Sequence, residues 1–77
     1  MPKLPVLTAR KLLKILIRAG FYEHHQSGSH IQMKHSDGRR TTVPFHNQEI
    51  RRGTLRAIIN DIEMTVDEFI ILMGKKK

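Results

Sequence analysis

The segment from Gln26 to Phe45 reads QSGSHIQMKHSDGRRTTVPF and holds two short stretches of alternating apolar and polar residues. In the first stretch, Ile31 and Met33 alternate with polar neighbours, which is the pattern of a strand with one buried face. The Asp-Gly pair that follows is a strong signal for a hairpin turn. The apolar face of the second strand then holds Thr41, Val43 and Phe45. This segment predicts an antiparallel hairpin whose apolar face lies against a core.

The other face of this hairpin carries polar side chains, which a period of two places together. They are His30, Gln32, Lys34, Arg40 and Thr42. Pro44 cannot donate a backbone hydrogen bond to a sheet, so it indicates a strand end or a sheet edge. The polar set combines a proton-transfer group, two cations and hydrogen-bonding side chains, which suits contact with a polyanion.

Helical spacing precedes the hairpin. Thr8 fits an N-cap and Gly20 fits the position after a helix end, so a helix is predicted over residues 8–19. Its apolar stripe consists of Leu12, Leu13, Leu16 and Ile17. Its opposite face is basic and consists of Arg10, Lys11, Lys14 and Arg18. Such a face is either solvated or a surface for phosphates or an acidic partner.

The remaining elements follow from local patterns. A first strand is predicted for Phe21–Gln26, just before the Ser-Gly-Ser turn. Thr54 fits the N-cap of a second helix, and Thr65 and Glu68 form a capping-box pair for a third helix that ends near Gly74. The second helix has apolar residues at helical spacing, namely Leu55, Ile58, Ile59 and Ile62. The order predicts an α+β fold with helices on one face of a three-stranded antiparallel sheet.

Length and composition narrow the class of protein. The chain has 77 residues, the size of a single domain over residues 1–77, and its formal net charge of +7 favours nucleic acid as a partner. It contains no Cys, which excludes disulfides and zinc sites built on thiolates. No apolar run approaches the roughly 20 residues that cross a bilayer, so no membrane contact and a cytoplasmic location are expected. Residues 75–77, all Lys, are expected to form a disordered basic tail.

The chain has five His, and their spacing bears on two kinds of chemistry. Strand alternation would place His24 and His25 on opposite faces, and the same holds for His30 and His35. The sequence also has no His-x-x-x-His pair and no Cys, so no metal or other cofactor is expected. The alternative is a site built by three His from different strands. RNA can be cleaved without a metal by a base, an acid and nearby cations, and His suits both proton roles because it titrates near neutral pH. His30 is either a plain surface residue or such a group. Gly28 before it is either a plain hairpin glycine or part of a phosphate-binding turn, because amides in a turn can bind a phosphate oxygen, and the second possibility favours a working His30.

Four short pieces also occur in a fixed order along the chain. They are AGF (Ala19–Phe21), GSH (Gly28–His30), VPFH (Val43–His46) and GTLRAI (Gly53–Ile58). In these pieces and their spacing the chain resembles the HicA (YcfA-like) toxins of bacterial type II toxin–antitoxin systems, which are small mRNA interferases. The resemblance covers nearly the whole chain. It implies a double-stranded-RNA-binding-like α-β-β-β-α fold, here with an added C-terminal helix.

The resemblance also implies an activity and a site. In the family the His of the GSH element is catalytic, which places the role on His30 and makes the protein an endoribonuclease that cleaves mRNA without a metal. Residues expected to contact RNA are Gly28, Ser29, Lys34, Arg39, Arg40 and His46, of which the three cations follow from the residue pattern alone as groups that could stabilise negative charge near His30. His46 is in addition either a second proton-transfer group or a loop residue. The usual partner is a HicB antitoxin that covers the active site and often binds DNA, so contact with DNA would be indirect.

Two departures from the family pattern stand out. Many members have a second His directly after the catalytic one, whereas this chain has Ile31, so a mechanism with two adjacent His is not expected. The segment from Phe69 to Lys77 extends beyond the family's typical end and either packs on the core or serves the antitoxin interface.

Two other functions fit parts of the sequence. The predicted second and third helices could form a helix-turn-helix that binds DNA, with Arg51, Arg52 and Arg56 on phosphates. Against this, the third helix begins with Asp67 and Glu68 and contains no Lys or Arg as far as Met73. A non-catalytic RNA-binding module would share the fold and the charge. Only a loss of RNA cleavage on substitution of His30 distinguishes a nuclease from such a module.

Overall fold

The computed structural model describes residues 6–45 and 49–74 of the chain. Its elements are β1 (Leu7–Thr8), α1 (Ala9–Arg18), β2 (Tyr22–Ser27), β3 (His30–Lys34), β4 (Arg40–Pro44), β5 (Glu49–Ile50), α2 (Arg52–Asp61) and α3 (Val66–Gly74). The expected roles of His46 and of the basic tail at 75–77 fall outside the described residues. The order of the helices and the longer strands is the order that the sequence predicts.

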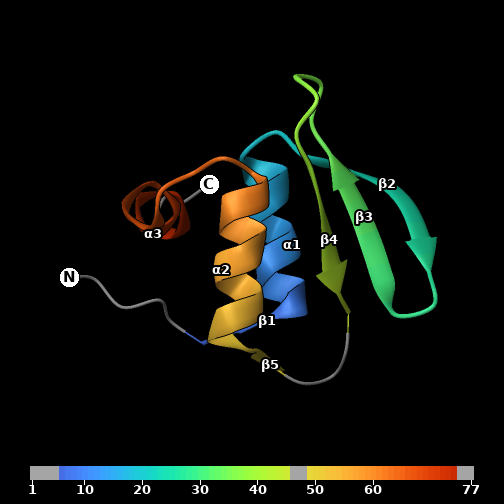
Figure 1. Ribbon diagram of the computed structural model, residues 1–77, viewed down its shortest axis with the longest axis horizontal. Helices are drawn as coiled ribbons and strands as arrows, with labels where there is room; N and C mark the ends of the chain where they lie inside the picture. The colour runs from blue at the N-terminus through green and yellow to red at the C-terminus, as the bar shows by residue number, and fades with distance from the viewer. Residues whose placement is uncertain (1–5, 46–48, 75–77) are drawn as a thin grey trace.

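The elements form a sheet with helices on one side. The three longer strands make an antiparallel sheet in the order β2-β3-β4, with α1 and α2 packed beside it (Figure 1). Both helices contact β4, and α3 packs on the two helices at the end of the molecule away from the sheet. β1 and β5 pair as a separate two-stranded sheet, which the sequence did not indicate. The predicted α+β fold is confirmed.

The hydrophobic core lies between the helices and strands β3 and β4. From the strands, Ile31, Met33, Thr41 and Val43 are buried, as their alternation predicts. The helices supply most of the rest, including Leu12, Leu16, Leu55, Ile58, Ile59, Ile62 and Phe69. All six residues of β2 are exposed, because this strand lies beyond the edge of the helical layer (Figure 1). The sheet therefore has one covered face on β3 and β4 and one open face.

Strand β2 differs from its prediction in two ways. It begins and ends one residue later than the predicted Phe21–Gln26, because Phe21 is buried in the core. It also contains a bulge: Glu23 pairs with Met33 but His25 pairs with Gln32, which leaves His24 as the extra residue. The strict alternation expected for His24 and His25 does not hold here. A bulge moves the following side chains to the other face without leaving a mark in the pattern of residue types.

The buried stripe of α1 also differs from its prediction at one position. Ile17 is 54% exposed, whereas Ile15, on the other flank of the stripe, is 6% exposed. The two flanks are equivalent in a helical pattern, and only the elements that pack beside the helix decide which one is covered.

Two of the three predicted helix starts are confirmed. The Oγ1 atom of Thr8 accepts a hydrogen bond from the Lys11 N–H at 3.2 Å, and Thr65 and Glu68 exchange the two bonds of a capping box. The prediction for α2 was wrong, because this helix begins at Arg52 and Thr54 lies inside its first turn. The pairing of β5 with β1 ends just before Arg51, so the chain enters the helix earlier than a side-chain cap would require.

Arg39 connects the β3–β4 hairpin to the ends of α1 and α2. Its Nη1 atom donates to the carbonyl of Ile62, the residue that ends α2, at 2.8 Å. Its guanidinium lies 5.2 Å from the ring centroid of Phe21, just beyond α1. Its Nε atom donates to Asp37 Oδ2 in the hairpin at 2.7 Å. These contacts hold the side chain, which is only 21% exposed, in one place.

His35 extends this arrangement toward Gly20. Its ring meets the Phe21 ring edge-on, with centroids 5.0 Å apart, and its Nδ1 atom accepts the Asp37 N–H at 3.1 Å. A Cβ atom added at Gly20 would lie 2.8 Å from the Nε2 atom of His35, and Gly20 has φ +100°. We call Gly20, Phe21, His35, Asp37 and Arg39 the hairpin clamp.

The carboxylate of Asp37 is the acidic member of the clamp. The backbone N–H of Arg39 donates to Asp37 Oδ1 at 3.0 Å, and this bond, together with the Arg39 guanidinium, holds the pKa of Asp37 below its ordinary value of 3.8. Because folding lowers this pKa, the ionised form stabilises the fold above the ordinary value. That stabilisation is lost as the pH falls through the lowered pKa.

The clamp predicts an unusual cost for Gly20→Ala. The substitution should lower the free energy of unfolding by roughly 1 to 3 kcal/mol for the backbone strain at positive φ. It should lower it further because the new methyl group displaces the His35 ring from its contact with Gly20. Urea unfolding of the parent and the variant measures this loss.

Gly38→Ala is the matched control, because Gly38 has φ +102° but a Cβ there meets nothing within 4 Å. It should cost less than Gly20→Ala, and the difference should shrink when both are made in a His35→Ala background. Equal losses at Gly20 and Gly38 in the parent background would contradict the steric role given to His35.

Candidate functional site

The open face of the sheet consists of three rows of side chains. Cross-strand partners in an antiparallel sheet point to the same face, so the register defines each row. The turn row is Ser27, His30 and Pro44, the middle row is His25, Gln32 and Thr42, and the hairpin row is Tyr22, Lys34 and Arg40. Neighbouring rows are two residues apart along β3 and β4, which is about 7 Å, whereas the bulge adds a third residue between Tyr22 and His25 on β2. The face therefore offers a ligand three positions that differ in chemistry.

His30, the predicted catalytic residue, stands at an exposed corner of this face. It begins β3 directly after the turn that contains Gly28 and Ser29. Gly28 has φ +58°, and a Cβ there would meet nothing within 4 Å, so the glycine serves the turn and the space beside it is open. The carbonyl of Ser29 accepts a hydrogen bond from the Phe45 N–H, which joins the start of β3 to the end of β4. The ring thus projects from a backbone that is fixed on both sides.

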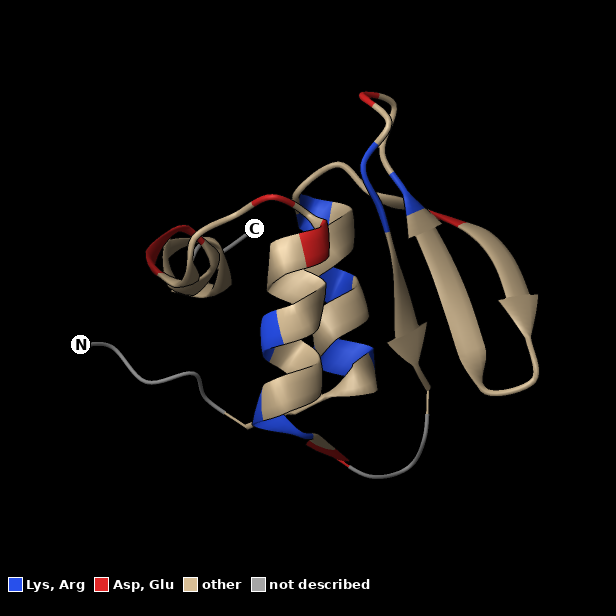
Figure 2. Ribbon diagram, viewed as in Figure 1, with Lys and Arg blue, Asp and Glu red and all other residues tan. Residues whose placement is uncertain are grey.

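Lys34 and Arg40 lie at the opposite end of the face. They are cross-strand partners in the hairpin row, and Lys34 is four residues along β3 from His30, which is about 13 Å. Figure 2 shows this separation, with basic residues at the hairpin end of β3 and β4 and none at the end where β2 turns into β3. These two cations therefore occupy a different position on the face from His30.

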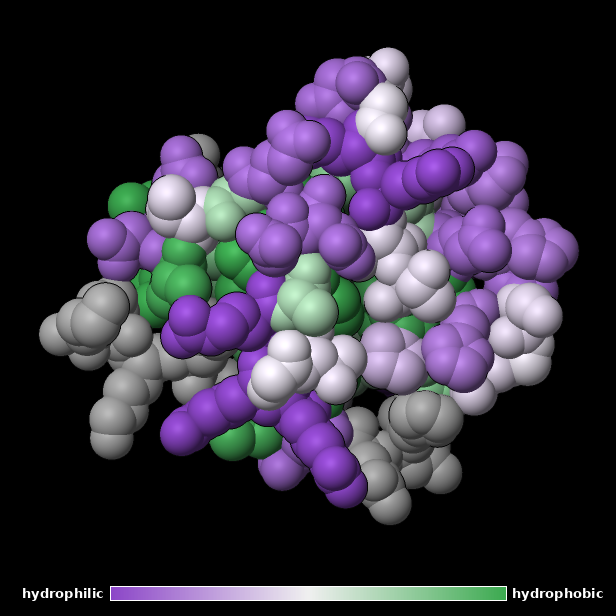
Figure 3. All heavy atoms as spheres, in the orientation of Figure 1, coloured by the Kyte–Doolittle hydropathy of each residue, from purple (hydrophilic) through white to green (hydrophobic). Residues whose placement is uncertain are grey.

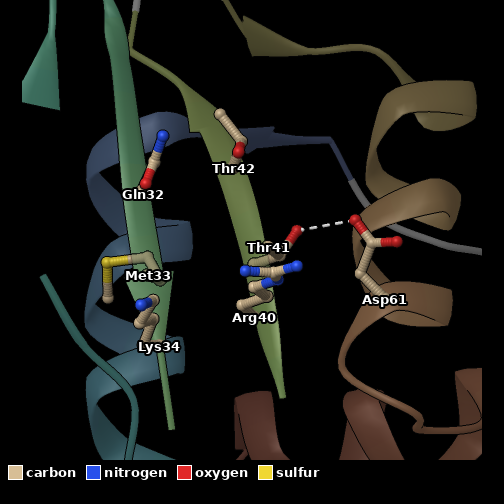
Figure 4. A pocket seen from close by; sticks show the side chains of 7 residues that line it. All are labelled: Gln32, Met33, Lys34, Arg40, Thr41, Thr42 and Asp61. Atoms are coloured by element: carbon tan, nitrogen blue, oxygen red, sulfur yellow. Dashed lines mark hydrogen bonds between the residues drawn. The ribbon is translucent and has the colours of Figure 1, made fainter. Parts of the chain in front are cut away.

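A hollow of about 390 Å³ lies between the hairpin row and α2 (Figure 4). Its lining residues are Gln32, Met33, Lys34, Arg40, Thr41, Thr42 and Asp61. The Thr41 hydroxyl donates to Asp61 Oδ2 at 3.0 Å, so this carboxylate is bound to the sheet rather than directed at the cations. Polar donors from β3 and β4 beside two cations suit a phosphate group of a nucleic acid.

Polar side chains also predominate on the surface around the hairpin (Figure 3). The side of the molecule that carries the hairpin and β2 is mostly hydrophilic, whereas apolar surface gathers toward α3 (Figure 3). On α3 the side chain of Ile71 is 66% exposed. In this view (Figure 3) the side formed by the hairpin and β2 is therefore more polar than the side near α3.

Arg39, another of the predicted RNA-binding residues, lies apart from the open face. Its guanidinium contacts Asp37, Phe21 and the carbonyl of Ile62 within the hairpin clamp. These contacts favour a structural role, and the assignment of Arg39 to RNA stays a prediction.

His25 is a residue of this face that the sequence did not single out. The bulge at His24 brings it opposite Gln32, in the row next to His30. Without the bulge, alternation from Tyr22 would put His24 in that position. No signal in the residue types marks the bulge, so sequence alone offered no reason to choose between the two histidines.

The basic face of α1 is exposed on the helical side of the molecule. Arg10, Lys11 and Lys14 are exposed there, and the Nη1 atom of Arg18 donates to the Leu72 carbonyl of α3 at 3.3 Å. Part of this face therefore holds α3.

The described residues contain neither a cluster of metal-binding side chains nor a membrane-spanning helix. Within 6–45 and 49–74, no three His, Asp or Glu side chains gather closely enough to bind a metal ion. In the same ranges no helix has the length and apolar character needed to cross a membrane.

Comparison with known proteins identifies the family. No curated protein sequence matches the chain closely enough to count as a relative. The family model for the HicA toxin of bacterial toxin–antitoxin systems matches residues 9–64, which run from the first residue of α1 to just before α3 and include the whole open face. The match spans more than half of the 77 residues. The chain therefore belongs to the HicA family, the toxins of bacterial toxin–antitoxin systems.

Proposed function

We propose that this toxin is an endoribonuclease that cleaves mRNA on the open face of its sheet, with His30 as a proton-transfer group. The observation that carries the proposal is the position of His30, exposed at the corner of a polar sheet face, in a chain of the HicA family. The net charge of +7 draws a polyanion to the protein before specific contacts form.

The proposed reaction needs no metal ion. A base removes the proton of a ribose 2′-hydroxyl, and the oxygen attacks the adjacent phosphorus. As the new P–O2′ bond forms, the P–O5′ bond breaks, its electron pair stays on O5′, and that oxygen takes a proton from an acid. The products are a 2′,3′-cyclic phosphate and a 5′-hydroxyl. His30 supplies one of the two proton transfers, which are worth roughly 10² to 10⁴ in rate.

Lys34 and Arg40 bind the RNA rather than the reacting phosphate. Lys34 lies about 13 Å from His30 along β3 and Arg40 pairs with Lys34, so both would hold a phosphate further along the RNA. This role agrees with the hollow beside them, whose polar lining is open to solvent. The open face would then bind RNA at the hairpin row and cleave it at the turn row.

The proposed partner is a HicB-type antitoxin that covers the same face. An acidic antitoxin surface would compete with RNA for the two cations of the hairpin row and shield His30. It would also associate quickly, because opposite charges steer the encounter.

The first prediction of this proposal concerns His30→Ala. Purified parent protein should cleave a long single-stranded RNA in EDTA, and the variant should be slower by roughly 10²-fold or more because a proton transfer is lost. Gel analysis of the cleaved RNA gives the rate, and treatment of the fragments with a phosphatase tests for the cyclic phosphate.

A folded His24→Ala variant is the control, because His24 is exposed on β2 but is the unpaired residue of the bulge. Equal cleavage by the parent and His30→Ala would remove His30 from the mechanism. No cleavage by either would favour the non-catalytic RNA-binding module. Binding to duplex DNA without cleavage of RNA would instead favour the helix-turn-helix interpretation.

A second prediction separates binding from chemistry. Lys34→Gln and Arg40→Gln should each raise KM for RNA, and each should lower the slope of log affinity against log salt by about 0.7, the value for one phosphate contact on a single strand. The value of kcat should change little. Arg39→Gln should instead lower the free energy of unfolding, because its partners are inside the protein. A fall in kcat without any change in KM on substitution of Lys34 or Arg40 would contradict the assignment of these residues to RNA binding.

A third prediction concerns the antitoxin. Its association rate should fall as salt rises from low to physiological concentration, because screening weakens attraction between exposed charges. Stopped-flow mixing of the two proteins measures this rate. A rate that stays constant over that range would exclude electrostatic steering.

A further inference from the structure

The turn and middle rows of the open face contain a second histidine beside His30. The bulge at His24 pairs His25 with Gln32, and Ser27, two residues later, pairs with His30. His25 and His30 are therefore diagonal neighbours on adjacent strands and share one face. Diagonal positions on an antiparallel pair are about 7–8 Å apart, which is within reach of long or aromatic side chains.

This spacing suits two proton transfers at one phosphate. The oxygens that gain and lose the proton lie on opposite sides of the phosphorus, and each needs a group within about 2.6–3.2 Å. A phosphate placed between the diagonal pair would have one imidazole beside each oxygen. A single histidine on the face could serve only one of them at a time.

Charge near His30 supports the same assignment. The other members of the turn and middle rows are Ser27, Pro44, Gln32 and Thr42, none of which carries a charge. Lys34 and Arg40 are two rows away from His30, and Arg39 is held in the hairpin clamp. Among the residues that the structure describes on these two rows, His25 is the group besides His30 that can carry a positive charge to a phosphate bound there.

The surroundings of His25 leave its ring available to a substrate. It faces Gln32 directly, His30 and Lys34 diagonally across β3, and Tyr22 and Ser27 along its own strand. No carboxylate is in this set. Glu23 pairs with Met33 and so belongs to the other face. His25 is exposed, at the outer strand of the sheet.

We propose that His25 is the second catalytic residue, paired with His30 as acid and base. This inference rests on the proposed function. One imidazole takes the 2′-hydroxyl proton as the P–O2′ bond forms, and the other, as imidazolium, gives its proton to O5′ as the P–O5′ bond breaks. The pair then exchanges its protons with water, so each turnover leaves the enzyme unchanged. The bulge places the His25 ring on the open face beside His30.

The test compares His25→Gln with His24→Gln, adjacent exposed residues of the same type. The RNA cleavage rate of the parent should rise and then fall with pH, since one group must be neutral and the other protonated. His25→Gln should lower kcat by roughly 10² or more, leave KM nearly unchanged and remove one limb of the pH profile. His24→Gln should keep both limbs and a rate within about threefold of the parent. Unfolding midpoints check that both variants are folded.

The outcomes distinguish this inference from the proposed function. If His30→Ala abolishes cleavage while His25→Gln keeps both limbs of the profile, the role of His25 is wrong and the nuclease stands. A lowered rate with both limbs intact would likewise overturn the proton transfer and leave His25 with a positioning role. If His30→Ala cleaves as well as the parent, or the parent does not cleave, the proposed function fails and the pair fails with it.

Discussion

The contacts of Arg39 determine how the sheet is held against the helices. Its guanidinium binds the carbonyl that ends α2, the ring that follows α1 and the carboxylate of the hairpin turn, three points that are far apart along the chain. A planar group with several fixed donors can satisfy all three at once, which a lysine ammonium could not do with the same geometry. His35 fills the space that remains, and only a glycine at position 20 leaves room for it. The AGF piece of the family resemblance therefore has a structural explanation in this fold.

The internal contacts of Arg39 determine where positive charge lies on the open face. With Arg39 turned inward, the positive charge of the hairpin row comes from Lys34 and Arg40, and it lies at the end of the sheet opposite His30. Lys34 and His30 are about 13 Å apart along β3, and in the proposed function this distance separates RNA binding from cleavage. A ligand that spans both ends must be extended and polyanionic, which a single-stranded RNA is and a mononucleotide is not. For the proposed nuclease, this spacing favours a polymer over a mononucleotide as substrate.

The sequence predicted the parts of the fold that rest on local periodicity. The hairpin, its buried face at Ile31, Met33 and Val43, and the capping box at Thr65 followed from residue types and their spacing. What it missed depends on partners distant in the chain. The short pairing of Leu7 with Ile50, the earlier start of α2 and the burial of Ile15 instead of Ile17 are all decided by neighbouring elements. For the site, the position of His30 on the open face could be predicted, but the place of His25 could not, because one inserted residue reverses the face of every position after it.

The C-terminal helix shows how far the core extends beyond the segment that defines the family. The family match ends at residue 64, whereas Phe69 of α3 is fully buried and belongs to the core cluster. Arg18 at the end of α1 donates to the Leu72 carbonyl, so α3 is bonded to the first helix as well as packed on it. Loss of a buried phenyl group costs about 3–5 kcal/mol in a typical core, a large share of the stability of so small a protein. The extension is therefore part of the structure that supports the sheet. The exposed Ile71 on its outer side is surface that the core does not use.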